Sequence, residues 1–188
     1  MVDILDYQAR WPGEFPAIAD GLRRSLGDLA LRIDHIGSTS APGLASKDII
    51  DIQVSVSDLG GQIAKRMKPL GYVHRPHIVD DHQPPLMNLD PDQWSKLYSR
   101  EADSDRATHI HIRVAGRANQ RYALLFRDYL RTHAETAFAY ATFKRRLGAL
   151  LEDTGVYADT KDPVCDLIML PAEQWAAQTL WQPGPSDA

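Results

Sequence analysis

The chain has one cysteine, Cys165, among 188 residues, so it can form neither an internal disulfide nor a cysteine-based zinc cluster. It lacks any apolar run that approaches the roughly 18 residues a membrane-spanning helix needs. Its N-terminal segment lacks the basic and then apolar pattern of a signal peptide. These absences favour a reducing compartment, and we expect a cytoplasmic protein with no membrane association.

Basic side chains are not in excess. Lysine and arginine total 21 against 25 aspartates and glutamates, which gives a formal net charge of −4. Broad nucleic-acid binding requires a basic surface that neutralises phosphates, so this balance argues against it. A local group of basic side chains can still hold one phosphate chain on an acidic protein. The expected partner is therefore a nucleotide or another small phosphate-bearing molecule.

The chain shows neither an internal repeat nor a linker that would divide it. Its length suits one domain, which we expect to span residues 1–181. Residues 182–188 are rich in proline and offer no large apolar side chain to bury. This composition predicts a disordered tail.

Alternation of polar and apolar residues predicts strands at 29–36, 49–56 and 109–114. Apolar residues recurring every three or four positions predict helices at about 16–26, 58–70, 119–132, 135–151 and 163–178. Asp58 is expected to cap one of these helices, and Phe138 and Leu150 to pack against the core. The stretch 74–106 is polar and proline-containing, which indicates a long functional loop with room for a short strand. Strands interleaved with helices predict an α/β or α+β fold.

Two of the predicted strands carry polar faces. Side chains two positions apart on a strand lie on the same face, so Asp51, Gln53 and Ser55 share one face of the strand at 49–56. By the same spacing, His109 and His111 share a face of the strand at 109–114. Whether the two faces lie close together cannot be read from the sequence.

A Gly-Ser pair, Gly37 and Ser38, follows the first predicted strand, and Asp51 lies on the second. Glycine lets the backbone approach a phosphate closely, and serine adds a hydroxyl and an N–H donor. A neighbouring carboxylate can hold a divalent cation that bridges phosphates. The pattern indicates a site for a nucleoside triphosphate; the alternative is an ordinary turn beside a solvated acid.

The run from His35 to Val54, HIGSTSAPGLASKDIIDIQV, resembles the signature of the GrpB family. The later RATHIHIRV, FRDYLRTH and YATFKRRL resemble further parts of that family, so the resemblance covers residues 7–169. It implies a nucleotidyltransferase-like mixed β-sheet flanked by helices, with a helical C-terminal half. In some bacteria such a domain is fused to dephospho-CoA kinase.

The sequence departs from the nucleotidyltransferase pattern at Gln53, where the resemblance implies a second acid. A neutral amide cannot replace a carboxylate in a two-Mg²⁺ site. His109 and His111 stand where a third acid is expected. One divalent ion, Mg²⁺ or Mn²⁺, held by Asp51 and substrate phosphates is one possibility. A mixed site of Asp51, His109 and His111, which would suit Zn²⁺, Mn²⁺ or Fe²⁺, is another.

These patterns yield two sets of candidate residues. Asp51 and His111 are the candidate catalytic residues. The candidate substrate-binding residues are Gly37, Ser38, Thr39, Lys47, Gln53, Arg106, Lys144 and Lys161. The first hypothesis is metal-dependent nucleotidyl transfer from a nucleoside triphosphate to a small acceptor. The alternatives are a nucleotide- or CoA-related binding domain without transfer chemistry, and metal-dependent hydrolysis at a His/Asp site.

Overall fold

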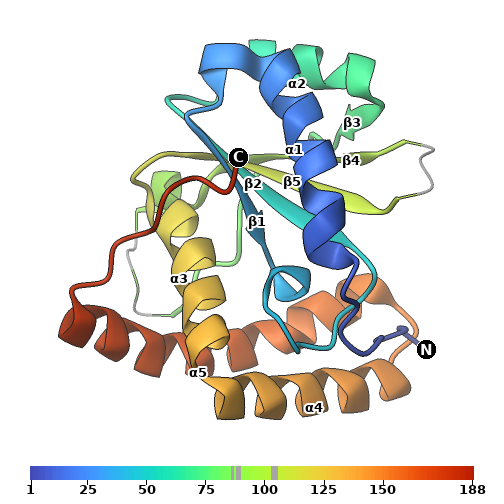
Figure 1. The fold of residues 1–188 in the computed structure, drawn as a ribbon, viewed down its shortest axis with the longest axis vertical. Helices are drawn as coiled ribbons and strands as arrows, with labels where there is room; N and C mark the ends of the chain where they lie inside the picture. Colours follow the sequence, from blue (N-terminus) through green and yellow to red (C-terminus); the bar gives the residue numbers. More distant parts are fainter. Residues whose placement is uncertain (86, 88–89, 103–105) are drawn as a thin grey trace.

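A computed structural model describes residues 1–85, 87, 90–102 and 106–188 of the chain. Its helices are α1 (Trp11–Leu26), α2 (Gln62–Met67), α3 (Ala118–Thr132), α4 (Ala134–Leu150) and α5 (Thr154–Thr179). Its strands are β1 (Arg32–Ile36), β2 (Ile50–Val56), β3 (Tyr72–His74), β4 (Lys96–Glu101) and β5 (Thr108–Val114). Figure 1 shows one sheet between two groups of helices. The predicted mixed α/β architecture with a helical C-terminal half is confirmed.

The strands form a five-stranded sheet in the order β1-β2-β5-β4-β3. Strands β2 and β5 are parallel, and the other pairs are antiparallel. The register places Asp51 opposite His109 and Gln53 opposite His111. The two polar strand faces expected from the sequence therefore form one continuous polar face of the sheet. Strand β4 lies inside the stretch that the sequence predicted as a loop.

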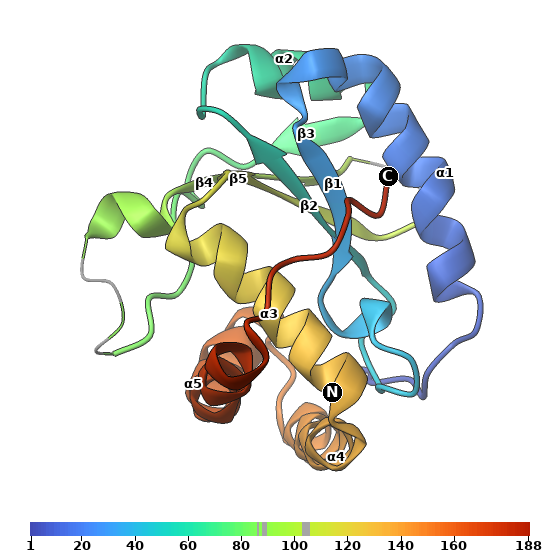
Figure 2. The ribbon, with the colours of Figure 1, turned by 60° about the vertical axis from the view of Figure 1, so that its left-hand side comes forward.

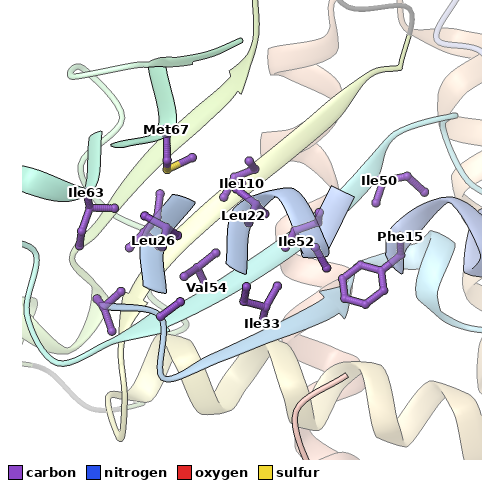
Figure 3. Close-up of a cluster of buried hydrophobic side chains, with 14 of the residues drawn as sticks. Phe15, Leu22, Leu26, Ile33, Ile50, Ile52, Val54, Ile63, Met67 and Ile110 are labelled. Atoms are coloured by element: carbon purple, nitrogen blue, oxygen red, sulfur yellow. The ribbon is translucent and has the colours of Figure 1, made fainter. Parts of the chain in front are cut away.

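Helices α1 and α2 cover the apolar face of the sheet (Figure 3). A row on α1 that repeats every three or four residues, from Trp11 through Phe15 to Leu26, is buried. It packs against Ile33, Ile52 and other apolar side chains of the central strands. Helix α1 was predicted to begin at about Pro16 but begins five residues earlier, at Trp11. Burial of Trp11 and Phe15 stabilises the additional residues. This packing leaves the opposite face of the sheet for polar residues.

Helices α3, α4 and α5 lie on the other side of the sheet (Figure 2). They form a second apolar core with Ala41, Leu44 and Ala45, which lie between the Gly-Ser turn and β2. The predicted packing of Phe138 and Leu150 is wrong, because these side chains are 73% and 80% exposed. Tyr140 and Lys144 lie on the buried side of α4. The helix is therefore rotated so that a basic side chain points inward.

Two predicted helix starts differ from the structure. Asp58 accepts a hydrogen bond from Gly60 N at 2.8 Å, so it forms a local turn, and α2 begins four residues later without a side-chain cap. Helix α5 begins at Thr154, nine residues before Pro163, and Asp153 caps it by accepting from the N–H groups of Gly155 and Val156. Within the described residues, no helix is both long and apolar enough to cross a bilayer.

The last residues of the chain, in the segment expected to be a disordered tail, contact strand β1 in the structure. Ser186 and Ala188 form hydrogen bonds with the main chain of Ile33 on the edge strand β1. His35 N donates to Asp187 Oδ2 at 3.0 Å. The physical reason is that the outer edge of β1 presents main-chain donors and acceptors, and these bind the tail although it has little to bury.

Candidate functional site

The turn between β1 and β2 brings Gly37 against Asp51. Gly37 has φ 68°, a left-handed backbone conformation that favours glycine. A β-carbon at this position would lie 2.5 Å from Asp51 Oδ2. Only glycine therefore allows the turn to approach the carboxylate this closely. The predicted juxtaposition of the Gly-Ser pair and the acid is present in the structure.

Asp51, His109 and His111 lie together on the polar face of β2 and β5. Asp51 Oδ1 is 3.3 Å from His109 Nδ1 and 3.7 Å from His111 Nε2. The three side chains are between 17% and 26% exposed. Tyr98 on β4 packs edge-on against both imidazole rings, with centroid distances of 5.5 and 5.2 Å. These contacts fix the histidines while leaving the group accessible to solvent.

Asp51 is ionised at neutral pH. Burial alone would raise its pKa, but hydrogen bonds from His109 and His111 outweigh that effect and hold the pKa well below its usual range. Burial lowers the pKa of His111 to about 4, and the charge of Arg113 adds to this shift. His111 is therefore neutral at pH 7, beside a negatively charged carboxylate.

Arg113 determines which nitrogen of His111 carries the proton. Its Nη2 is 3.3 Å from His111 Nδ1. A guanidinium can only donate hydrogen bonds, so His111 Nδ1 must accept and the ring proton of the neutral form lies on Nε2. The ring proton of His111 then lies on the nitrogen that is 3.7 Å from Asp51 Oδ1.

Asp81 holds this arrangement in place. It accepts hydrogen bonds from Arg113 Nε and Nη2 at 2.7 and 2.8 Å, from Lys96 Nζ at 2.7 Å and from Asn119 Nδ2 at 3.0 Å. Arg113 and Lys96 are 5% and 8% exposed. Burial would raise the pKa of Asp81, but Arg113 above all, and then Lys96, hold it far below its usual range. Sequence reasoning missed Asp81, because it lies in the polar stretch far along the chain from its partners.

Gln53 is fully buried. Its Oε1 accepts a hydrogen bond from Arg113 Nη1 at 2.7 Å, and its Nε2 donates to Gln120 O at 3.2 Å. The amide is therefore satisfied inside the protein. Its contact with substrate stays a prediction.

The donor set does not fit two Mg²⁺ ions, because Asp51 is the only carboxylate grouped with His109 and His111 in the described part of the chain. One divalent ion fits. The three candidate ligand atoms lie within 4.8 Å of one another, and an ionised carboxylate with neutral imidazole is the protonation state that metals require. Ligation by His111 Nε2 would require Arg113 to release Nδ1, since a ligating imidazole usually donates from its other nitrogen. Asp51 and His109 are therefore the better-placed ligands.

Lys144 reaches the Gly-Ser turn from α4. Its Nζ donates to Ser38 Oγ at 2.7 Å and to the carbonyl of Ala45, and it lies 4.5 Å from the centroid of the Tyr140 ring. The side chain is 3% exposed. Burial lowers the pKa of Lys144 to about 7, and the charge of Lys161 contributes.

Lys47 and Lys161 both interact with the charge of the Asp51 carboxylate. Burial lowers the pKa of Lys47, with Asp51 opposing the shift. Burial also disfavours charged Lys161, but nearby Cys165 and acidic groups that include Asp51 outweigh it and raise its pKa. Lys161 Nζ is 3.8 Å from Asp162 and 3.4 Å from Cys165 Sγ. All three predicted lysines therefore lie close enough to Asp51 to interact with its charge.

Two other candidates have mainly structural contacts. Arg106 forms ion pairs with Glu14 and Asp48 at 2.8 and 2.9 Å, on the α1 side of the chain. Thr39 is fully buried; its Oγ1 donates to Ile49 O at 3.2 Å and lies 3.0 Å from His35 Nε2. Both residues contact the segment just before β2, and their contacts with substrate stay predictions.

Comparison with known families matches residues 1–170 to a family described as GrpB protein. The chain belongs to the GrpB family. The crystal structure of the conserved protein GrpB from Enterococcus faecalis is similar, with a TM-score of 0.70 and 27% sequence identity over 92% of this chain and 99% of that one. The resemblance inferred from the HIGST run and the Asp51 strand is confirmed.

Two curated relatives differ in length. The dephospho-CoA kinase of Mycobacterium leprae is 35% identical over 190 residues, which cover 92% of this chain and 46% of that protein. A UPF0157 protein of Halalkalibacterium halodurans is 31% identical over 171 residues, which cover 89% of this chain and 80% of that protein. The chain therefore spans about half the length of the Mycobacterium leprae relative.

Proposed function

We propose that this GrpB protein binds a nucleoside triphosphate beside Asp51 and transfers its nucleotidyl group to a small acceptor. The observations that carry this proposal are the hydrogen bond from Lys144 to Ser38 in the Gly-Ser turn and the electrostatic interaction of Asp51 with Lys47, Lys144 and Lys161. Lys47 and Lys161 carry most of the positive charge of this cluster, because burial lowers the pKa of Lys144 to about 7. A phosphate chain is the ligand chemistry that such a cluster attracts.

Each group has a defined part in the proposal. Ser38 and Lys144 bind phosphate oxygens, and Lys161 neutralises the charge that develops on the leaving pyrophosphate. A single divalent ion at Asp51 and His109 would supply charge neutralisation at the reacting phosphate. His111 presents its Nε2–H toward Asp51 and helps to keep the carboxylate ionised. Phosphoryl-type transfer depends mainly on such positioning and charge neutralisation.

One observation favours binding without transfer as the second candidate function. Gln53 stands where the superfamily resemblance implies a second acid, and Arg113 and Gln120 engage its amide. The protein therefore lacks the charge for a second Mg²⁺ at this position. A nucleotide- or CoA-related ligand would then be held by the same lysines but not turned over. The kinase name of the Mycobacterium leprae relative makes dephospho-CoA a compound to include in a ligand screen.

A thermal-shift screen tests the proposed site. Wild type and variants are heated with each of the four nucleoside triphosphates, CoA or dephospho-CoA, with and without Mg²⁺ or Mn²⁺. A ligand present at about 100 times its dissociation constant stabilises the folded state by about 2.7 kcal/mol, which is readily measured. We expect Asp51→Asn to lose the metal-dependent part of the shift, and Lys161→Met to lose most of the nucleotide-dependent part.

Lys65→Met is the matched control, because Lys65 is an exposed lysine on α2, on the opposite side of the sheet. Its shift should equal that of wild type. If no nucleotide changes the melting temperature with any metal, the triphosphate site is wrong. If nucleotides bind but pyrophosphate is never released in the presence of hydroxyl-bearing acceptors, the binding function replaces the transfer function.

A further inference from the structure

Ser38 and Lys144 form a hydrogen-bonded hydroxyl–amine pair. The 2.7 Å distance between Ser38 Oγ and Lys144 Nζ joins residues that are 106 positions apart in sequence. Lys144 is almost completely buried, and within the described residues it forms no ion pair with a carboxylate. A buried lysine without a counter-ion is poised to lose its proton, which is how lysine serves as a general base.

The surroundings of Lys144 support this role. The groups that act electrostatically on Lys144 are Lys161 and Cys165 on α5, Asp51 on β2 and Arg145 on its own helix. Burial is the largest effect, and it lowers the pKa of Lys144 to about 7. Near neutral pH a substantial fraction of the amine is therefore uncharged. The uncharged amine can still donate an N–H to the carbonyl of Ala45 while its lone pair accepts the hydroxyl proton of Ser38.

Ser38 differs from the other two hydroxyl residues in the same turn. Ser40 Oγ donates to Gly37 O at 2.6 Å, and Thr39 Oγ1 donates to Ile49 O at 3.2 Å. Both of these residues are buried, whereas Ser38 is partly exposed. Ser38 also follows Gly37 at a sharp strand-to-3₁₀ turn beside Asp51. Only Ser38 combines solvent access with a basic partner.

We propose that Ser38 is a nucleophile with Lys144 as its general base, and that Ser38 transiently carries the nucleotidyl group during transfer. This rests on the proposed nucleotide site and changes its chemistry from direct to two-step transfer. A pair of serine and lysine is an established variant of the nucleophile–base arrangement. The surrounding lysines select a phosphoric anhydride as the electrophile.

The transfer takes place in two steps. Ser38 Oγ attacks the α-phosphorus, the new Oγ–P bond forms, and the bond from that phosphorus to the bridging oxygen breaks. Pyrophosphate leaves, and the hydroxyl proton passes to Lys144 Nζ. In the second step an acceptor hydroxyl attacks the same phosphorus, Ser38 Oγ leaves and regains its proton from Lys144, and the acceptor proton goes to solvent.

The test measures covalent labelling without an acceptor. The full chain is incubated with Mn²⁺ and each of the four nucleoside triphosphates labelled at the α-phosphorus, and the modified residue is located by peptide mass spectrometry. We expect label on Ser38, and exchange of labelled pyrophosphate into the triphosphate. Ser38→Ala should abolish both signals, and Ser40→Ala, which removes a hydroxyl from the same turn, should retain them.

Lys144→Arg separates a base from a phosphate-binding charge, because arginine keeps the charge but does not deprotonate. We expect it to keep the nucleotide-induced thermal shift and to lose at least nine-tenths of the label. If the arginine variant does not fold, Lys144→Met is tested with an alkyl fluorophosphonate, which labels activated serines by releasing fluoride and needs no nucleotide. Wild type should react at Ser38 and the methionine variant should not.

The outcomes distinguish this inference from the proposed function. A nucleotide-induced thermal shift with no label on Ser38 and no pyrophosphate exchange overturns the covalent role and leaves the nucleotide site standing. Reaction of Ser38 with the fluorophosphonate in the absence of any nucleotide-induced shift supports the Ser38–Lys144 pair and overturns the nucleotide assignment. Equal fluorophosphonate labelling of wild type and Lys144→Met overturns the role of Lys144 as the base.

Discussion

Gly37 lies so close to Asp51 that a β-carbon on residue 37 would stand 2.5 Å from a carboxylate oxygen of Asp51. The turn and the acid are therefore positioned by each other. A glycine can be required because its φ is positive, or because a β-carbon would collide with a neighbour, and Gly37 meets both conditions. Gly37 and Gly43 both have positive φ, at 68° and 80°, but a β-carbon at Gly43 would meet nothing within 4 Å.

Replacement of these two glycines by alanine should have unequal effects. Gly43→Ala costs only the left-handed backbone strain, about 1 to 3 kcal/mol. Gly37→Ala adds displacement of Asp51, and we expect about 2 kcal/mol of further destabilisation. Urea unfolding of both variants measures the difference. Equal losses would show that Asp51 moves aside freely and that the close contact does not constrain the turn.

Metal affinity should depend more on His109 than on His111. Arg113 occupies Nδ1 of His111 and leaves the proton on the nitrogen nearest Asp51, whereas no guanidinium contacts His109 in the described part of the chain. We expect His109→Ala to weaken Mn²⁺ binding by about tenfold or more, and His111→Ala to weaken it less. Electron paramagnetic resonance of free Mn²⁺ measures both affinities. The reverse order would mean that Arg113 releases His111 when a metal binds.

Asp81 should be essential for stability. Its removal leaves Arg113 and Lys96 buried without their carboxylate. We expect Asp81→Ala to lose about 3 to 5 kcal/mol of unfolding free energy. Asp80→Ala is the control, since that neighbouring side chain is exposed, and its change should stay within about 0.5 kcal/mol. Chemical denaturation followed by circular dichroism distinguishes the two, and similar values would contradict the central role of Asp81.

Lys144 should make stability depend on pH. Its pKa is about 7 in the folded protein against 10.5 for an ordinary lysine, so between these values the unfolded chain binds more protons. The free energy of unfolding therefore rises with pH across that window, and below it the buried charge disfavours folding.

The comparison of wild type with Lys144→Met isolates this effect, because other titrating groups largely cancel. We expect the wild-type minus variant difference in unfolding free energy to increase from pH 7 to pH 10, with a slope of up to about 1.4 kcal/mol per pH unit. Urea titrations at several pH values measure it. A difference that stays constant with pH would place the pKa of Lys144 near that of an exposed lysine.

Local sequence patterns predicted the elements that are regular and alternate cleanly. The strand with Asp51 and Gln53 was predictable because β-branched residues alternate with polar ones, and the strand with His109 and His111 for the same reason. Their parallel pairing was not predictable, since no local signal specifies which strands become neighbours. The family resemblance, and not periodicity, connected the helical lysines with the turn.

Other parts of the structure depend on contacts that the sequence does not reveal. The stretch 74–106 was expected to leave room for a short strand, but β4 could not be located in it because its inward-facing Lys96 is polar and becomes buried only through Asp81. Helix α5 was predicted to begin at Pro163, yet it continues through that residue. Pro163 is exposed, so water can reach the carbonyl that would otherwise have accepted the missing N–H.

The C-terminal residues also bear on where the folded unit can be cut. The family match stops at residue 170, but α5 continues to Thr179 and the segment beyond it satisfies both main-chain groups of Ile33. A protein trimmed at the family boundary would end inside a helix and leave the outer strand of the sheet with unpaired donors and acceptors. Such an edge pairs readily with the same edge of another molecule. Self-association of a shortened protein would then result from loss of the C-terminal residues that pair with β1, and it would say nothing about the native assembly.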